Sequence, residues 1–534
     1  MRASPGAGVG EPDHKETIRG IAGTPEGGGR GIAANAAIYT AGIYAAQVGI
    51  FVGGIVQKGL LGPVATGYWA LMETFAALLV IASLGASHGT SRQVPLRRGR
   101  GDYAGAAAVA DTGSTFSVLA VATAGAAIAL VAVAFGGGWA PEVRYGLVLV
   151  GLLAPLRLYV DAHEVLLQVT NRFPAVSSGV VVKSLIVLTV QTLLVYEFGY
   201  YGMFLGLAAA TIGVFLFWSR LGLAGPKNPA FAWHVDRRWL REVIAFGLPI
   251  LIYAQTWLLF MAVDNFIVAG LIDARNLGYY ALAVSVTSYI MFLPTSIGAA
   301  VSPRMMEDFG ETGRIESIRH LATRVQTTLA WLLLPIFVGA AFFLVPVLIR
   351  HALPAFEPAI PVVHIMVAGS FCLALTGMPV KMLLSAGYRW GLTGLEAVCL
   401  LMNAAMNYVA IAVLDWGLEG AAFATALSYF VTLLILTTYA LSKAYERREV
   451  LVHLLEILAV FAYLLGALWG IEWLLGDGTG GVGADVAVGL LKFALLLVLL
   501  APWMALAERR YQALTASLEL ARRARRTLRQ LRRG

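Results

Sequence analysis

Long apolar stretches alternate with short polar breaks from residue 31 to residue 507 of this 534-residue chain. Each stretch is roughly 20 residues long, enough for an α-helix to cross a hydrocarbon core about 30 Å thick. Backbone N–H and C=O groups without hydrogen-bond partners are energetically costly in lipid, and a helix pairs them internally. The pattern therefore predicts an all-α polytopic membrane protein. It predicts about fourteen transmembrane helices. We expect them at 31–57, 64–88, 107–135, 145–169, 173–198, 200–222, 242–270, 277–300, 321–349, 358–386, 389–414, 417–441, 450–475 and 485–507.

The distribution of Lys and Arg predicts how these helices are oriented. Only 13% of the residues are charged, yet the net charge is +8. Alternate loops hold most of the cations, and the intervening loops hold only four, Lys58, Arg144, Arg275 and Arg350. Basic loops stay in the cytoplasm, so both termini are predicted to be cytoplasmic in a cell membrane. The basic charge therefore reflects membrane orientation and does not indicate a nucleic-acid partner.

The two ends of the chain are polar. Residues 1–30 are rich in Gly and charge and are predicted to be a disordered cytoplasmic leader, without the order of a cleaved signal peptide. Residues 508–534 form an Arg-rich amphipathic stretch, which we expect to bind anionic lipids of the inner leaflet. The alternative is a tail that only fixes topology. Cys372 and Cys399 both lie inside predicted spans, so no disulfide framework is implied.

Internal similarity predicts two parallel halves. The aligned pairs are 59–71 with 270–282, 166–173 with 383–390, and 198–202 with 416–420. Their offsets of 211, 217 and 218 residues are nearly equal, so six spans repeat as a block. We therefore expect an N-lobe over 31–222, a cytoplasmic linker over 223–241, a C-lobe over 242–442 and two additional helices within 450–507.

Motifs for enzymatic chemistry are missing from the sequence. No glycine loop for phosphate is found, and the His residues, including His163, are not paired at ligand spacing. A single His such as His163 is more often a satisfied core residue. The chain is predicted to be a transporter without cofactor or metal.

Charged residues inside the fourth and fifth predicted spans are the main site candidates. Arg157, Asp161 and Glu164 fall at i, i+4 and i+7, on one helical face. A hairpin about Phe173 would bring Glu164 and Lys183 to one depth, about 14 Å from the turn. Buried charges need partners or a purpose. We expect Arg157 and Lys183 to bind an anionic headgroup while the acids pair with them in the empty state; the alternative is a structural clip.

Other intramembrane ionisable residues are candidates of the same kind. Lys381 and Glu396 flank the corresponding hairpin of the second half and are expected to form an ion pair, with Lys381 also a candidate headgroup ligand. Glu73 and Asp264 are lone acids. Either is expected to act as a protonatable coupling site or to pair with Lys58 or Arg275 near the outer surface.

Two further groups have a structural alternative. Arg92 and Arg304 follow the second and eighth spans, where they are expected to contact the headgroup or to anchor the helix ends at the interface. Tyr39, Tyr253 and Trp257 are expected to line a sugar-accepting cavity, although aromatic residues also gather at membrane interfaces.

Three segments carry a family resemblance. The stretch 59–71, with Leu84-Gly85 and the Arg-rich loop after it, resembles the opening of polysaccharide-transport flippases in the multidrug/oligosaccharidyl-lipid/polysaccharide exporter superfamily. Residues 246–282 resemble the start of that family's second half, and 417–422 its late-span signature. The resemblance extends over roughly residues 31–445.

The resemblance implies two six-helix lobes around a cavity with alternating access. It implies translocation of a polyprenyl-pyrophosphate-linked oligosaccharide to the outer leaflet for surface polysaccharide assembly. We expect a polysaccharide polymerase or other assembly proteins as partners. Three alternatives stay open: a cation-coupled multidrug antiporter, a peptidoglycan-precursor flippase and a non-transporting scaffold. The drug branch typically has an acid in the first span, where this chain has none.

Overall fold

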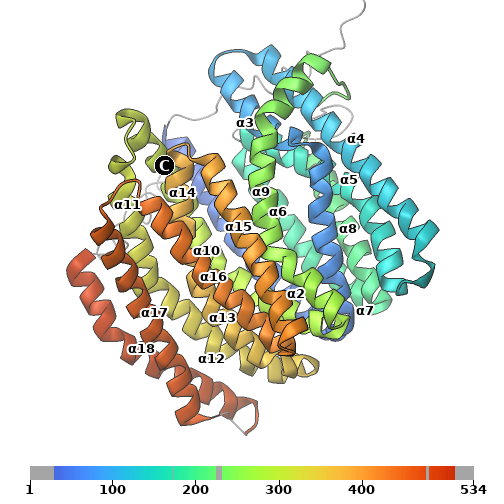
Figure 1. The fold of residues 1–534 in the computed structure, drawn as a ribbon. Helices are drawn as coiled ribbons and strands as arrows, with labels where there is room; N and C mark the ends of the chain where they lie inside the picture. The colour runs from blue at the N-terminus through green and yellow to red at the C-terminus, as the bar shows by residue number, and fades with distance from the viewer. Residues whose placement is uncertain (1–28, 171, 224–230, 477–479, 512–534) are drawn as a thin grey trace, which may run out of the picture. The chain divides into compact units, whose positions relative to one another are not determined.

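The computed structural model describes residues 29–170, 172–223, 231–476 and 480–511 (Figure 1). Side chains are described outside 29–41, 45 and 506–511. Within these ranges the regular structure is helical throughout, which confirms the all-α fold. Thirteen runs of helix in the described residues are long and apolar enough to span a membrane, so the protein is a multi-pass membrane protein.

The first span of the structure contains two of the predicted helices. Helix α2 (Gly29–Leu78) counts 50 residues, which at 1.5 Å per residue would be about 75 Å long. Its path breaks at Gly62, where φ is 69° and ψ is 177°, immediately before Pro63. Glycine adopts this conformation without a Cβ clash. The break separates two helices, so this one run of helix corresponds to two of the fourteen predicted spans.

The described residues divide into two compact units. Unit 1 comprises the chain through Leu61 and residues Met72–Gln255; unit 2 comprises Gly62–Leu71 and everything from Thr256 onward. The boundary thus runs through α2 and through α9, whereas the sequence predicted it in the linker 223–241. The predicted lobes, linker and additional helices stay a prediction.

Unit 1 is built from short connections between long helices, and α4 and α5 lie side by side in it (Figure 1). Its elements after α2 are η1 (Leu79–Ser83), α3 (Ala86–Gly99), α4 (Tyr103–Phe135), η2 (Gly136–Gly138), α5 (Pro141–Val169), α6 (Phe173–Ile186), η3 (Val187–Gln191), α7 (Thr192–Phe198), α8 (Tyr200–Arg220) and the first half of α9 (Arg237–Leu271). Gly125 of α4 and Gly151 of α5 face each other so closely that a Cβ on either would overlap the other's carbonyl group. Small residues allow such close approach of helices in membranes.

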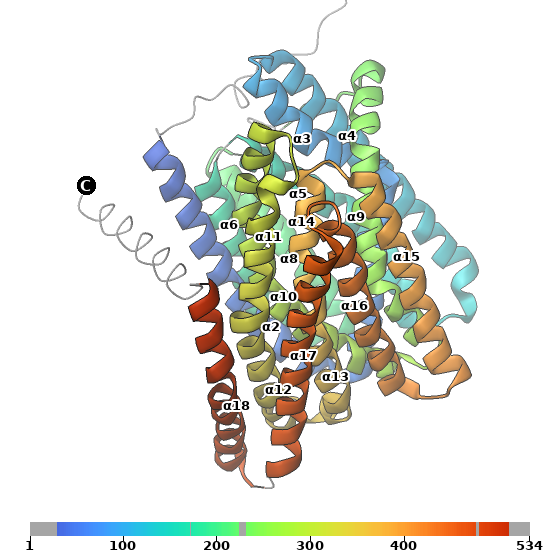
Figure 2. The same ribbon diagram turned by 60° about the vertical axis from the view of Figure 1, so that its left-hand side comes forward.

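Unit 2 continues with the rest of α9 and ends with the neighbouring helices α17 and α18 (Figure 2). Its other elements are α10 (Ala274–Thr312), α11 (Glu316–Thr328), η4 (Leu329–Leu333), α12 (Leu334–Ala352), η5 (Pro354–Ala359), α13 (Ile360–Leu375), α14 (Gly377–Ser385), α15 (Arg389–Tyr408), η6 (Val409–Val413), α16 (Gly417–Leu441), α17 (Arg447–Leu475) and α18 (Val482–Tyr511). Helix α18 packs against both α12 and α17. The two final helices are thereby attached to this unit.

Most predicted spans agree with the structure to within a few residues, and two do not. The span expected at 277–300 continues as α10 to Thr312. The span expected at 64–88 ends at Ser83, where Leu84 and Gly85 take up left-handed backbone conformations. A separate, largely polar helix α3 follows it. Its Arg97 donates to Asp102 at 2.7 Å, and the Asp102 side chain accepts from the Gly105 amide at the start of α4. This N-cap fixes the turn between the two helices.

Candidate functional site

The fourth predicted span, helix α5, presents the predicted row of charges. The Arg157 Nε lies 3.8 Å from the Asp161 Oδ2, and their side chains are 47% and 46% exposed. The distance is long for an ion pair, and about half of each side chain is exposed. Arg157 therefore keeps guanidinium N–H groups available for a ligand.

Helix α6 adds the second cation to this face. Lys183, which is half-buried, lies close enough to interact electrostatically with Asp161 and with Glu164. Glu164 also accepts a hydrogen bond from the Gln168 side chain at 3.2 Å. The hairpin of α5 and α6 thus brings Glu164 and Lys183 together, as the sequence predicted. Whether these residues bind a headgroup stays a prediction.

The lone acid of the second span joins the same group. Glu73 interacts electrostatically with Arg157 and, more weakly, with Lys58. The sequence had considered only Lys58 as its partner. We call Arg157, Lys183, Asp161, Glu164 and Glu73 the unit 1 charge cluster. It contains three acids and two cations. Each cation can therefore exchange its interaction with an acid for one with an arriving anion.

His163, which lies between Asp161 and Glu164 in the sequence, is not part of this cluster. It is 1% exposed and its Nδ1 lies 2.9 Å from the Tyr159 carbonyl oxygen. Its ring packs among Tyr159, Phe215 and Phe231 at centroid distances of 4.6 to 5.7 Å. His163 is therefore a core histidine, as expected, but its Nε2 has no hydrogen-bond partner among the described residues.

The ion pair expected between Lys381 and Glu396 is wrong. Glu396 is 2% exposed, and neither of its carboxylate oxygens has a hydrogen-bond partner among the described residues. The aliphatic part of the Lys381 side chain instead packs against Gly298 of α10, so closely that a Cβ on Gly298 would overlap it. Residue counting placed the two at similar depth, but it could not determine their directions around the helix axes.

Asp264 lies in a buried hydrogen-bond network of unit 2. The Tyr280 hydroxyl donates to its carboxylate, and the Thr425 hydroxyl lies 3.4 Å from its Oδ2. The Asn265 backbone N–H also donates to it, at 3.1 Å. These neutral donors replace the ion pair with Arg275 that the sequence allowed. Asp264 is only 1% exposed.

The remaining predicted residues are scattered. Arg92 is exposed on α3, and Arg304 is 74% exposed with its Nε 4.0 Å from Asp308. Tyr253 and Trp257 are half-buried on α9, whereas the side chain of Tyr39 and the tail 512–534 lie outside what is described. Roles for all of these stay predictions.

Sequence analysis missed a group of charges on the last two spans. Lys492 of α18 donates to Glu472 of α17 at 2.9 Å, and the two side chains are 6% and 23% exposed. Asp485 of α18 lies 2.9 Å from the His351 Nε2 of α12 and is 5% exposed. Charged residues within the expected spans 450–475 and 485–507 were the available signal. These contacts join α18 to its neighbours. The ammonium group of Lys492 is already paired with Glu472 in them.

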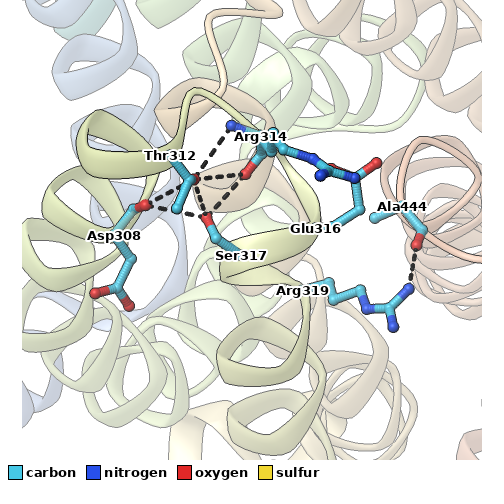
Figure 3. Close-up of polar contacts among 7 residues, drawn as sticks. All are labelled: Asp308, Thr312, Arg314, Glu316, Ser317, Arg319 and Ala444. Carbon is cyan, nitrogen blue, oxygen red and sulfur yellow. Dashed lines mark hydrogen bonds and ion pairs between the residues drawn. The ribbon is translucent and has the colours of Figure 1, made fainter.

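A groove of about 920 Å³ opens beside the turn between α16 and α17. Arg319 of α11 holds this turn by donating to the Ala444 carbonyl at 2.8 Å (Figure 3). In the turn between α10 and α11, the Thr312 hydroxyl donates to the Ser317 hydroxyl. Three cations and four acids line the groove, namely Arg319, Lys443, Arg448, Glu316, Glu446, Glu449 and Glu456. The lining has no excess of positive charge for a pyrophosphate. In the described residues no group of three or more His, Cys, Asp or Glu could hold a metal ion.

Outside the membrane-spanning segments, Asp102 at the α3–α4 turn and His88 on α3 have shifted pKa values. The Gly105 amide, followed by Arg97, lowers the pKa of Asp102 below its usual value. Burial lowers the pKa of His88 on α3, and the nearby Arg92 lowers it further. Both effects follow from ordinary hydrogen bonding, desolvation and like charge. Neither creates a reactive group.

Comparison with known proteins identifies the family. The model of a family described as "Polysaccharide biosynthesis protein" matches residues 60–352, more than half of the chain. This chain belongs to the polysaccharide biosynthesis protein family. The family match includes the unit 1 charge cluster. No curated protein matches the chain.

Several solved structures are similar to this chain in fold. An inward-facing multidrug resistance MATE family transporter of the MOP superfamily has a TM-score of 0.61 at 15% identity, covering 76% of this chain and 95% of its own. The lipid II flippase MurJ in an inward closed conformation has a TM-score of 0.60 at 14% identity, covering 86% and 97%. An outward-facing MATE transporter scores 0.55 at 15% identity, covering 82% and 98%. The predicted MOP-superfamily fold is confirmed.

Proposed function

We propose that this protein moves a polyprenyl-pyrophosphate-linked oligosaccharide from the cytoplasmic to the outer leaflet by alternating access, for surface polysaccharide assembly. The observation that carries the proposal is the unit 1 charge cluster. Arg157 and Lys183 sit within membrane-spanning helices, and Arg157 is about half exposed. Charges at this depth are costly and usually serve a substrate or ion pathway.

The chemistry of the cluster suits a pyrophosphate. A guanidinium presents parallel N–H donors to two phosphate oxygens, and an ammonium adds a point charge. Asp161, Glu164 and Glu73 hold these cations when no ligand is bound, so the empty protein does not bury unpaired charge. A headgroup arriving between them exchanges one set of anions for another. The lipid tail needs no such site because it stays in hydrocarbon.

The family supports the same substrate class, because its description refers to polysaccharide biosynthesis. Two similar structures are titled a lipid II flippase and a multidrug resistance transporter, so the fold is found in both kinds of transporter. A drug antiporter and a peptidoglycan-precursor flippase are therefore the alternatives to be tested. The basic tail 508–534 is proposed to bind anionic lipids, and a polymerase is a proposed partner.

The test is translocation in proteoliposomes containing the full-length protein. A fluorescent polyprenyl-pyrophosphate oligosaccharide is followed by its accessibility to an impermeant quencher, with the same glycan on a polyprenyl monophosphate and a lipid II analogue as comparisons. We expect movement of the pyrophosphate lipid above empty liposomes and slower movement of the monophosphate. Movement of lipid II alone, or of cationic dyes alone, would assign the protein to one of the alternatives. No movement of any substrate would overturn the transport proposal.

A further inference from the structure

Residues 231–236, within the predicted linker, lie against α4 and α5 of unit 1. They form no helix, yet Phe231 is only 2% exposed. Its ring belongs to a buried cluster with Ala106 and Ala110 of α4 and Leu166 of α5. We call residues 231–236 the strap. The chain continues from it directly into α9, which belongs partly to each unit.

Three buried side chains of α4 hold the strap by its backbone. The Ala232 N–H donates to the Asp111 Oδ1 at 2.6 Å, and the Thr115 hydroxyl donates to the Ala232 carbonyl at 3.1 Å. The Asp236 N–H donates to the Thr112 hydroxyl oxygen at 3.2 Å. Asp111, Thr112 and Thr115 are each no more than 3% exposed. Buried hydrogen-bonding groups are costly to leave unpaired, so these bonds fix the strap at one place on α4.

The aromatic side chains of the strap contact α5. The Trp233 ring stacks on the Tyr159 ring at a centroid distance of 5.7 Å and an interplanar angle of 6°. The Phe231 ring lies 5.6 Å from the Tyr159 ring and 5.7 Å from the His163 ring. Phe215 of α8 packs against the same two rings of α5. Trp233 is 59% exposed, so it covers one side of Tyr159 and does not fill the core.

Tyr159 and His163 lie on the face of α5 opposite to its charged residues. At 3.6 residues per turn, the two rings point about 150° away from the mean direction of Arg157, Asp161 and Glu164. The strap therefore packs behind the residues that α5 contributes to the unit 1 charge cluster. The helix cannot rotate or tilt here without losing its contacts with the strap.

This part of α5 needs support because Pro155 weakens the helix just before it. Proline has no N–H, so the carbonyl of Gly151 cannot accept its usual helical hydrogen bond. The first half of α5 is held by the close contact of Gly151 with Gly125 of α4. The second half carries Arg157 and Asp161, and a proline allows it to bend relative to the first. Its direction is therefore set by what packs on its sides.

We propose that the strap is a positioning element of the headgroup site, with Phe231 and Trp233 as its positioning residues. By supporting the rear face of α5, the strap directs the charged face of this helix toward Glu73 of α2 and Lys183 of α6. The site is then assembled before the ligand arrives, which lowers the free-energy cost of binding. This inference rests on the proposed function, because it specifies what orients that site.

Amide hydrogen exchange of the full-length protein in nanodiscs, without ligand, tests the support of α5 directly. We expect residues 156–169 to exchange faster in Trp233→Ala. The same is expected of the double variant Thr112→Val/Thr115→Val, which loses two hydrogen bonds to the strap and keeps the shape of both side chains. Residues 141–154 of the same helix should be unchanged, whereas a globally destabilised protein would exchange faster throughout.

Each variant has a matched control. Trp473→Ala removes an indole ring that is 86% exposed on α17. Thr123→Val removes an exposed hydroxyl of α4 that donates to the Leu119 carbonyl of its own helix. Neither control should change the exchange of residues 156–169. Trp233→Phe, which keeps an aromatic ring beside Tyr159, should retain wild-type exchange.

Ligand binding distinguishes positioning from folding. The fluorescent polyprenyl-pyrophosphate oligosaccharide is titrated against the same proteins. We expect the dissociation constant to rise roughly 3- to 10-fold in Trp233→Ala with the number of sites per protein unchanged, because the strap can bias α5 only by its own interaction energy. Partial misfolding would instead lower the number of sites at constant affinity. Trp233→Phe should bind with the wild-type constant.

Exchange of residues 156–169 that is unchanged in both Trp233→Ala and the threonine double variant would overturn the inference and leave the headgroup site standing. Faster exchange at unchanged affinity would also overturn it, because the strap would then be a structural contact only. A wild-type protein that binds no pyrophosphate lipid would overturn the proposed function instead, and faster exchange in the variants would still show that the strap supports α5.

Discussion

Gly67 and Gly278, which occupy equivalent positions in the repeated motifs 59–71 and 270–282, contact each other in the folded protein. A Cβ on Gly67 would lie 2.9 Å from the backbone nitrogen of Gly278, and a Cβ on Gly278 would overlap the Pro63 carbonyl. The segment Gly62–Leu71 therefore packs backbone to backbone on the start of α10 within unit 2. The two copies of the repeated motif thus contact each other inside unit 2.

Replacing either glycine should destabilise this contact. Because a new methyl group would meet backbone, which cannot rotate away, we expect Gly67→Ala or Gly278→Ala to lower the free energy of unfolding by roughly 1–3 kcal/mol. The measurement is thermal unfolding of the purified protein in detergent. Gly466→Ala on α17, where nothing lies within 4 Å, is the control and should be neutral or slightly stabilising. Equal effects at all three positions would contradict the contact.

Removing the cations of the unit 1 charge cluster should impair binding of the pyrophosphate lipid. Loss of one charge-assisted hydrogen bond is worth about 1.5–3 kcal/mol. We therefore expect Arg157→Ala and Lys183→Ala each to weaken substrate binding roughly 10- to 100-fold while expression and membrane insertion are unchanged. Arg220→Ala at the exposed end of α8 serves as the control. An identical loss in that variant, or misfolding of both cluster variants, would argue against a headgroup site.

The ion pair of Lys492 with Glu472 should show strong coupling. Breaking a buried pair leaves one charge uncompensated, so Lys492→Met alone should cost about 3–5 kcal/mol. Glu472 is 23% exposed, so the cost should fall at the lower end of that range. In a double variant with Glu472→Leu most of the stability should return, as measured by thermal unfolding of the four proteins of the cycle. Additive losses would mean that the two side chains do not stabilise each other.

The Asp102 side chain should make stability depend on pH in the acid range. Its pKa is lowered in the folded protein by the Gly105 amide and then by Arg97. An acid with a depressed pKa stabilises the fold above its unfolded pKa of about 4 and loses this contribution as pH falls through the folded value.

Asp102→Asn keeps a good N-cap but removes the ionisable group. The variant should therefore be less stable than wild type near neutral pH, and the difference should disappear at low pH in unfolding measurements over a pH series. Asp102→Ala, which also removes the cap, should be about 1 kcal/mol less stable than Asp102→Asn at every pH. A constant difference between wild type and Asp102→Asn would refute the linkage.

Glu396 should lower the stability of the protein. Its carboxyl group is buried without a hydrogen-bond partner among the described residues, so an apolar side chain of similar size removes an unfavourable group. We expect Glu396→Met to raise the melting temperature, measured by thermal unfolding of the purified protein in detergent. A lower melting temperature would show that the acid is instead a structural element.

The length and spacing of the apolar stretches alone predicted the membrane-spanning helices. Lipid imposes helices of one minimum length, so the spans could be read from composition, and even the break at Gly62 follows from Gly next to Pro. The row Arg157, Asp161 and Glu164 was also predictable, because helix geometry fixes which residues share a face. The interaction of Glu164 with Lys183 followed from counting residues on either side of one short turn.

Only the tertiary structure decided which polar groups meet across helices. Counting along a helix gives depth, but the rotation of one helix against its neighbour is set by packing of the whole surface. For this reason Lys381 and Glu396 share a depth and do not pair, His163 faces an aromatic core, and Asp264 finds Tyr280 and Thr425 instead of Arg275. Asn407 of α15 meets Thr425 of α16 for the same reason.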